Sequence, residues 1–349
     1  MNHTAQSLVS RTAISPVATG LVGLDGRPLR RARTRDHMTF DQRTVDSTGS
    51  FLIGELERLD QTLHQPLYTV TWSRDIDLRE DVTIADETSS FTNSSFAATG
   101  GVNPNGKAWI GKDSNAIAGL QLDIGKTANP LTLWGMELSW TIPELESAIK
   151  LGRPVDQQKY AGMQTKYNMD VDEMVYIGDA DLGYTGLFNG TVGTTGNAPT
   201  GTWATATADQ ILADVNALLQ AVWAASGYAA MPDTLRLDPL SYGRLVSRKI
   251  SDQGSISILE FIRQNNMSND QNGRPLDINS VKWLATAGAG GTRRMVAYTK
   301  RPDFVRFPLV PLQRTPLENR SIWQLTTYFG RLGVVEIVYG ETMGYYDGL

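Results

Sequence analysis

Cysteine is absent from the sequence, and histidine occurs only three times. Without thiols the chain forms no disulfides, thiolate nucleophiles, zinc ribbons or iron–sulfur clusters, and this absence is typical of a reducing compartment. The histidines are His3, His37 and His64, all upstream of the strongest helix and strand patterns. Their positions disfavour Ser-His-Asp chemistry and histidine-rich metal sites.

Long hydrophobic runs are absent too. No apolar stretch approaches the roughly 18 residues of a membrane span, and the N-terminus lacks the basic-then-apolar pattern of a signal peptide. We therefore expect a protein that is neither secreted nor bound to a membrane. With 349 residues and 41% hydrophobic content, the chain can form one large or two ordinary domains with a substantial core.

The charge is unevenly distributed along the chain. The net charge of -5 disfavours a protein devoted to nucleic acid. Residues 1–43 nevertheless carry seven arginines and three aspartates, which leaves the remainder of the chain strongly acidic. A basic arm of this kind suits a phosphate-bearing or acidic partner, although a solvated tail has the same composition. The closely spaced arginines of this arm are Arg27, Arg30, Arg31, Arg33 and Arg35.

The first predicted elements are a helix and a hairpin. Residues 51–63 have apolar positions at helical spacing, and residues 68–86 alternate in the manner of extended chain. Residues 86–118 are rich in Ser, Thr, Asn and Gly, and strand character returns over 119–140. Two long strands that flank a polar tip predict a projecting hairpin, which needs a neighbour to lie on.

Two capping signals and one apolar stripe mark three helices. Thr141 and Glu144 form a capping-box signature at the start of one helix, and Thr207 and Gln210 form another. Between them, residues 154–177 predict a helix about 35 Å long, with a single apolar stripe. The stripe consists of Tyr160, Met163, Tyr167, Val171 and Met174.

The second half of the chain mixes strand and helix patterns. Residues 233–239, 278–286 and 293–299 read as strands, and residues 240–250 and 255–266 as helices, so residues 201–300 predict an α/β unit. The last 30 residues predict two further strands. The second of these, Leu332 to Tyr339, is almost continuously apolar, and we expect it to be buried on both faces.

Two groups of carboxylates are candidate sites for chemistry. Asp179 and Asp181 begin like a calcium loop, but the positions that require Gly and Glu hold Tyr184 and Gly190. The same stretch lacks a complete phosphate loop or dinucleotide fingerprint. The second group is Asp170, Asp172 and Glu173, which we expect to form a solvated helix face. We therefore predict no catalytic, cofactor-binding or metal-binding residue, no cofactor and no enzyme activity.

The order of these elements resembles the major capsid proteins of tailed phages, whose Hong Kong 97 fold is shared with encapsulins. Residues 151–190 and 293–349 carry the likeness, whereas residues 1–60 are only compatible with it. In that family a Gly-x-x-Gly-Leu-x-Asn turn leads from the long "spine" helix to the next domain. Gly183, Gly186, Leu187 and Asn189 fit this form.

The resemblance implies an α+β Hong Kong 97-like capsid fold, and it assigns a role to each part of the chain. The glycines of the turn would permit a sharp exit from the spine helix, including positive φ. The implied parts are an N-terminal arm with a short helix at 1–66, an extended loop at 67–141, a peripheral domain with the spine helix at 142–200, an axial domain at 201–300 and peripheral return strands at 301–349.

The implied function is that of a major capsid protein. Its copies would form the hexamers and pentamers of an icosahedral head shell around packaged double-stranded DNA, which the basic arm would contact. Scaffold, portal and decoration proteins are further implied partners, and the virion, assembled in the host cytoplasm, is the implied location. Two alternatives remain. One is an encapsulin-like compartment, which needs neither DNA nor the arginine cluster, and the other is a carboxylate-dependent hydrolase centred on Asp179 and Asp181.

Overall fold

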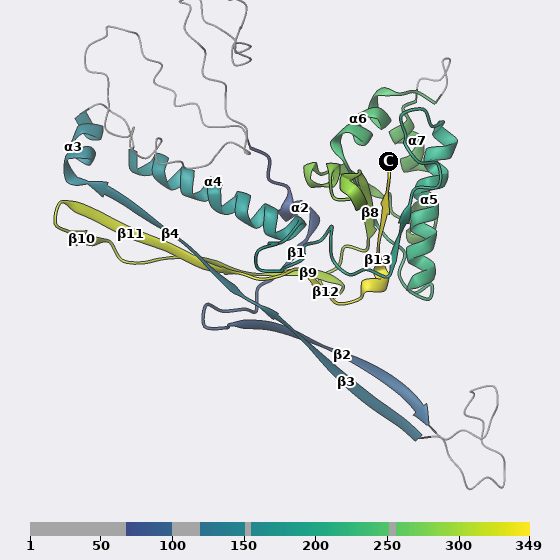
Figure 1. The fold of residues 1–349 in the computed structure, drawn as a ribbon, viewed down its shortest axis with the longest axis horizontal. Helices are drawn as coiled ribbons and strands as arrows, with labels where there is room; N and C mark the ends of the chain where they lie inside the picture. The colour runs from purple at the N-terminus through teal and green to yellow at the C-terminus, as the bar shows by residue number, and fades with distance from the viewer. Residues whose placement is uncertain (1–67, 100–118, 151–154, 251–255) are drawn as a thin grey trace, which may run out of the picture. The chain divides into compact units, whose positions relative to one another are not determined.

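The computed structural model describes residues 68–99, 119–150, 155–250 and 256–349. The elements discussed below lie within Val70–Leu349. They form a mixed α+β structure with a six-stranded, a five-stranded and a two-stranded sheet (Figure 1). The predicted helix at 51–63 and the basic arm lie outside the described residues.

The two-stranded sheet is an antiparallel ribbon of β2 (Thr88–Thr99) and β3 (Gly119–Pro130) (Figure 1). The prediction of a polar tip over 86–118 was wrong for β2, which lies inside that range. A ribbon with solvent on both faces needs little apolar content, so a Ser/Thr/Asn-rich segment can form one of its strands. Residues 100–118 lie outside the described part of the chain.

Residues 68–86 were predicted to be extended throughout, and this was wrong. They contain the single-turn helix α2 (Trp72–Asp75) and only a short strand, β1 (Asp77–Arg79). The alternating pattern failed because Asp75, a polar position in it, is fully buried. Its hydrogen bonds, described below, stabilise the turn.

The six-stranded sheet has the order β1-β9-β11-β10, with β12 paired to β9 and β4 paired to β11. β4 and β11 pair antiparallel over their whole length, whereas β1 runs parallel to β9. The remaining strands are β4 (Thr132–Thr141), β9 (Val305–Arg314), β10 (Glu318–Arg320), β11 (Trp323–Leu332) and β12 (Glu336–Ile337).

Two helices accompany this sheet. α3 (Ile142–Lys150) begins at the predicted capping box: the Glu144 amide donates to Thr141 Oγ1 (3.2 Å) and the Thr141 amide to Glu144 Oε2 (3.4 Å). α4 (Val155–Tyr176) confirms the predicted long helix. Of its apolar stripe, Met163, Val171 and Met174 are buried, whereas Tyr160 is exposed.

The five-stranded sheet has the order β5-β13-β8-β6-β7. Its strands are β5 (Thr194–Asn197), β6 (Thr234–Leu237), β7 (Asp277–Ser280), β8 (Arg294–Tyr298) and β13 (Met343–Asp347). Its helices are α5 (Ala208–Ala225), α6 (Pro239–Ser247), α7 (Ile258–Asn265) and α8 (Met267–Asn272), with short 3₁₀ turns at Lys282–Ala285, Ala289–Gly291 and Gly340–Thr342.

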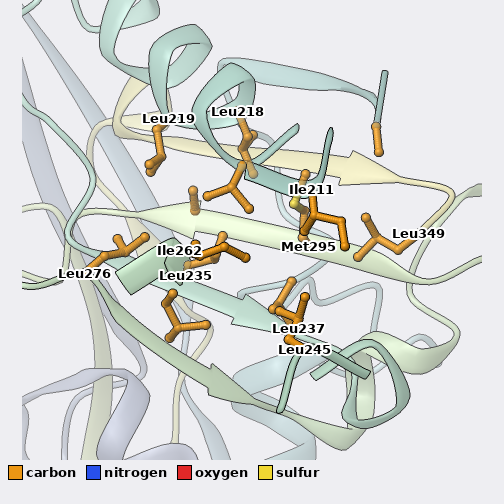
Figure 2. Close-up of a cluster of buried hydrophobic side chains, with 14 of the residues drawn as sticks. Ile211, Leu218, Leu219, Leu235, Leu237, Leu245, Ile262, Leu276, Met295 and Leu349 are labelled. Carbon is orange, nitrogen blue, oxygen red and sulfur yellow. The ribbon is translucent and has the colours of Figure 1, made fainter. Parts of the chain in front are cut away.

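The main apolar core lies between these helices and the five-stranded sheet. Both halves of the predicted capping box at Thr207 and Gln210 are present at the start of α5. Leu218 and Leu219 of α5, Leu235 of β6 and Met295 of β8 are fully buried in one cluster (Figure 2). A second buried cluster joins the end of α4 to the six-stranded sheet.

Two features of the strands differ from expectation. β5 and β13 join the five-stranded sheet, although both come from ranges that the resemblance assigned to the peripheral domain. The predicted strand from Leu332 to Tyr339 is wrong, because Leu332 is the last residue of β11 and, after it, only Glu336–Ile337 forms a strand in this range. Its expected burial is confirmed at Val334 and Val335. β11 ends just before Gly333, where a Cβ would lie 2.4 Å from Pro308 Cγ.

Candidate functional site

The segment that follows α4 is a tight glycine-dependent junction. Gly178 and Gly183 have φ values of 78° and 71°, which favour glycine. Gly186 does not have positive φ, contrary to expectation, and is required for a different reason. A Cβ there would lie 2.5 Å from the carbonyl carbon of Tyr176. Gly178 was missed from the sequence, although its Cβ would lie 2.3 Å from the oxygen of Tyr184.

Backbone pairing explains why Gly186 must be so close to α4. The amide of Leu187 donates to the oxygen of Val175 (2.7 Å), and that of Phe188 donates to the oxygen of Tyr176 (3.0 Å). Asn189 closes the turn, because its Oδ1 accepts from the Gly186 amide at 2.6 Å and its Nδ2 donates to the Ile177 oxygen at 2.7 Å. The predicted Gly-x-x-Gly-Leu-x-Asn form therefore acts as one hydrogen-bonded unit.

The junction is also bound to the five-stranded sheet. Tyr345 donates its hydroxyl to the Leu187 oxygen at 2.6 Å, and Arg294 Nη1 donates to the Phe188 oxygen at 2.6 Å. Arg294 also forms a two-point pair with Asp347, at 2.6 and 2.9 Å. Burial acts to raise the pKa of Asp347, but the hydrogen bonds from Arg294 and a backbone amide leave that pKa lowered. The charged pair thus fixes the junction against β8 and β13.

Asp179 shapes the turn between the glycines. Its Oδ1 accepts the amides of Asp181 (2.9 Å) and Leu182 (3.3 Å), as predicted for a turn aspartate. Asp181 contributes its amide to this turn, and its carboxylate forms no hydrogen bond to the described residues. Among those residues no group of three or more His, Cys, Asp or Glu is arranged to hold a metal ion. The absence of a metal site from the protein as a whole stays a prediction.

Calcium or magnesium is expected to leave the thermal midpoint of the unassembled subunit unchanged. A cation that binds only the folded state must raise the midpoint by mass action, and this turn offers a cation few oxygen ligands. Differential scanning fluorimetry with and without each cation measures the effect. A metal-dependent rise that disappears in Asp181→Asn would establish a metal loop instead.

The expectation of a solvated carboxylate face on α4 was wrong for Asp172. This residue is fully buried, and its carboxylate accepts from the Thr71 amide (2.9 Å) and from the indole of Trp283 (2.8 Å). It therefore connects α4 to the start of α2 and to a 3₁₀ turn. The sequence did contain a signal, since Asp172 follows buried Met169 by three residues and precedes buried Tyr176 by four.

A buried charge network centres on Arg236 of β6, which is fully buried with Asp75. Arg236 Nε donates to Asp75 Oδ1 at 2.8 Å, and Nη2 donates to Asp277 Oδ2 at 2.7 Å. Asp75 also accepts from Arg74 and from the hydroxyl of Tyr176. The network therefore connects α2, α4, β6 and β7.

The electrostatics of this network favour a permanent ion pair. Burial acts to lower the pKa of Arg236, but its charged neighbours, Asp75 and Asp277 among them, raise it above the ordinary arginine value. Burial, together with Asp75, raises the pKa of Tyr176, so this hydroxyl remains a donor. The network is therefore a structural anchor that holds α2 and α4 against β6 and β7.

The start of the β2–β3 ribbon is anchored by a second buried carboxylate, Glu336. It accepts from Arg79 Nη1 (3.1 Å), from Arg306 Nε (2.7 Å) and from the hydroxyl of Ser89 in β2. Arg79 also pairs with Asp81. The hydrogen bond to Asp81 raises the pKa of Arg79, and the negative charge of Glu336 raises it further. The ribbon is therefore tied to β1, β9 and β12 where it begins.

One face of the ribbon is apolar and exposed. The pairing places Phe96 opposite Leu122, with Leu120 and Ile124 two residues to either side on the same face. Their exposed fractions are 68, 54, 70 and 62%, respectively. A row of large apolar side chains of this kind marks an interaction surface. We name these four residues the ribbon stripe.

None of the helices in the described ranges is long and apolar enough to cross a membrane. The described residues instead combine interlocked sheets, a spine helix with a glycine junction, and an exposed strand ribbon. The chain belongs to the major capsid protein family, whose model matches residues 106–349.

Solved structures show the same fold. The capsid of Myoviridae phage XM1 is 17% identical, with a TM-score of 0.68 over 86% of this chain and 100% of that one. The capsid of a native GTA particle is 12% identical, with a TM-score of 0.57 over 87% and 98% of the chains. For Mycobacterium phage Bobi the identity is 12% and the TM-score 0.54, over 85% and 95%. No curated protein matches the sequence.

These findings confirm the predicted family and its Hong Kong 97-like fold. The protein is a phage head shell protein, a component of the virion that assembles with copies of itself. The family is one of structural proteins, so the comparisons give no support to the hydrolase alternative at Asp179 and Asp181.

Proposed function

We propose that copies of this chain form the hexamers and pentamers of an icosahedral shell that encloses double-stranded DNA. The observation that carries the proposal is the ribbon stripe. Burying one such apolar side chain contributes roughly 1.5–3 kcal/mol, and a closed shell repeats the contact in every copy. Because the chain belongs to the major capsid protein family, a second copy is the occupant that we propose for the stripe.

The parts of the chain take distinct roles in this shell. Residues 67–141 form the extended loop, whose ribbon lies on a neighbouring copy. The peripheral domain consists of 142–193 and 301–342. The axial domain consists of 194–300 with 343–349, because β5 and β13 belong to its sheet, and it clusters at the centres of hexamers and pentamers. Residues 1–66 form the arm.

The basic arm favours a DNA-filled head over an encapsulin-like compartment. Five arginines lie between Arg27 and Arg35, whereas a compartment that loads protein cargo has no need of them. We propose that they face the particle interior, where they contact DNA or, before packaging, an acidic scaffold. Portal and decoration proteins complete the set of proposed partners, and assembly takes place in the host cytoplasm.

Leu120→Asp with Leu122→Asp is expected to leave a folded subunit that does not form shells. Both side chains are exposed in the single subunit, so a charge there costs little stability, but it disrupts the contact with a neighbour. Light scattering and negative-stain microscopy measure assembly, and circular dichroism checks the fold. The matched control is Gln121→Asn with Asp123→Asn on the opposite face of β3, which is expected to assemble normally. Normal particles from the charged variant would contradict the proposal.

Replacing the five clustered arginines with alanine is expected to reduce DNA binding and its dependence on salt. Each phosphate contact contributes about 0.9 to the slope of log affinity against log salt, so the slope falls by about 4.5 if all five contact DNA. Fluorescence anisotropy at several salt concentrations, with DNA content of particles as a second readout, measures the effect. Unchanged slope and DNA content would show that the arm is only a tail.

A further inference from the structure

The ribbon is anchored at the end from which it leaves the subunit, its root, and it is exposed beyond that end. In β3 the residues Gly119–Ala128 are all exposed, as are Thr92–Phe96 of β2. Thr99 follows Ser90 by nine residues, which extend about 30 Å at about 3.3 Å per residue. A rotation of about 10° at the root would move the far end by about 5 Å, which is one strand spacing. The contacts at the root therefore decide where the ribbon stripe lies.

A buried carboxylate receives the start of the ribbon. Glu336 of β12 is fully buried, and it pairs with Arg79 (3.1 Å) and with Arg306 (2.7 Å). The hydroxyl of Ser89, which is also buried, donates to the same carboxylate. A charged acceptor that loses a buried donor is left incompletely satisfied, which costs more than an ordinary hydrogen bond contributes. The contact therefore strongly favours one position of Ser89.

Arg79 holds the ribbon a second time. Its Nη1 donates to Ser89 Oγ at 2.9 Å and to the Ser90 oxygen at 3.0 Å. Its Nε and Nη2 donate to Asp81 at 2.6 and 3.0 Å. Because the guanidinium is planar, the two contacts with Asp81 fix the direction in which Nη1 points. Arg79 thus joins the ribbon to β1 at a defined angle.

The second strand of the ribbon is held at the root as well. The Leu131 amide donates to the Glu87 oxygen (2.9 Å), and Arg331 Nη1 donates to the Leu131 oxygen (3.2 Å). Leu131 also packs in a small buried apolar cluster with Val82 and Val310. The root is therefore held on both of its strands, which restricts rotation of the ribbon more than contacts to β2 alone would.

We propose that Arg79, Ser89 and Glu336 form a clamp that holds the ribbon within a narrow range of angles, and that this restriction makes the shells uniform in size. The inference rests on the proposed shell, since it concerns the angle at which the ribbon stripe meets a second copy. A closed shell repeats related contacts in every copy, so subunits whose ribbons rotate freely would join at many angles and close at several sizes. The three residues are positioning residues, because they act through the ribbon and not by contact with the second copy.

Distances between spin labels test the clamp in the unassembled subunit, because the natural chain offers no cysteine of its own. Labels at Gln121→Cys, near the far end of β3, and at Asp303→Cys, just before β9, occupy exposed positions. The width of the distance distribution between them reports how far the ribbon rotates. Ser89→Ala is expected to widen it about twofold, because this change removes the hydrogen bonds to both Glu336 and Arg79.

The matched control is Ser95→Ala. Ser95 is an exposed serine of β2, six residues from Ser89 and on the same side of the strand. It is expected to leave the width unchanged. Arg79→Lys is a second variant of the clamp, which keeps the positive charge beside Glu336 but loses the fork that binds Asp81. It is also expected to widen the distribution, whereas a merely structural role for Arg79 and Ser89 would lower the urea midpoint without widening it.

Particle size supplies the second measurement. In electron micrographs the natural chain and Ser95→Ala are expected to give one size of shell, and Ser89→Ala and Arg79→Lys several. Unchanged label distances in both clamp variants would overturn this inference and leave the proposed function intact. Wider distances with shells of one size would overturn the link between the clamp and shell size. If the natural chain formed no shells, the proposed function would fail, while the label distances would still test the clamp.

Discussion

Gly186→Val is expected to leave little soluble protein. The valine Cβ would lie 2.5 Å from the Tyr176 carbonyl carbon and 2.6 Å from the Ile177 nitrogen, and both are backbone atoms that cannot rotate away. Relief requires breaking the Leu187 and Phe188 hydrogen bonds to α4 and lifting two buried side chains. We expect a loss of about 4 kcal/mol or more, which is a large fraction of the roughly 5–15 kcal/mol that stabilises an ordinary domain.

Two variants of the same turn serve as controls. In Gly183→Ala the new Cβ lies in open space, so the variant loses stability only through the strain of alanine at positive φ, about 1–3 kcal/mol. Asp181→Asn changes an exposed carboxylate and is expected to stay within about 0.5 kcal/mol of the natural chain. The stabilities of the three variants are compared by their soluble yields and by the midpoints of their urea unfolding curves. If Gly186→Val were as stable as Gly183→Ala, the close approach to α4 would not exist in solution.

Arg236→Met is expected to destabilise the subunit by about 3–5 kcal/mol, because it leaves Asp75 buried without its fully buried partner. The double variant with Asp75→Asn is expected to be less damaging than the sum of the two single changes, since no buried charge then remains uncompensated. Denaturant unfolding of the unassembled subunit measures both effects.

The control for Arg236 is an arginine at the surface. Arg274 is largely exposed and lies 3.8 Å from Asp233, so Arg274→Met should change stability by less than about 1 kcal/mol. Equal midpoints for the two methionine variants would mean that the network around Asp75 contributes no more than a surface pair.

Local signals in the sequence predicted the helices well. Capping boxes at Thr141 and Thr207 specify helix starts through side-chain hydrogen bonds that span only three residues, so their geometry is encoded locally. The glycine junction is local in part: the bond from the Gly186 amide to Asn189 spans three residues, whereas the bond from Asn189 to the Ile177 oxygen spans 12. The spine helix was predictable because its apolar stripe, from Tyr160 to Met174, extends over about four turns.

Long-range pairing was not predictable from local patterns. Arg236 lies in a strand that is buried on both sides, and only its partners Asp75 and Asp277, distant in sequence, make its burial stable. Glu336 similarly depends on Arg79 and Arg306. β13 belongs to the five-stranded sheet because it pairs with β5 and β8. No pattern within Met343–Asp347 specifies these two neighbours.

The polar composition of β2 explains why residues 88–99 were predicted to be part of a polar tip and not a strand. A strand is normally recognised by its apolar face, but β2 contributes only Phe96 to the ribbon stripe and is otherwise rich in small polar residues. Its partner β3 supplies Leu120, Leu122 and Ile124. The stripe therefore becomes visible only when the register of the two strands is known.

Electron microscopy of the purified, full-length protein tests the central claim most directly. The account predicts closed, uniform icosahedral shells made of this chain, in which density for each ribbon lies on a neighbouring copy. Supplying a scaffold or raising the protein concentration should increase their number. A protein that stays monomeric under all of these conditions, while Leu120→Asp with Leu122→Asp behaves identically, would contradict the account.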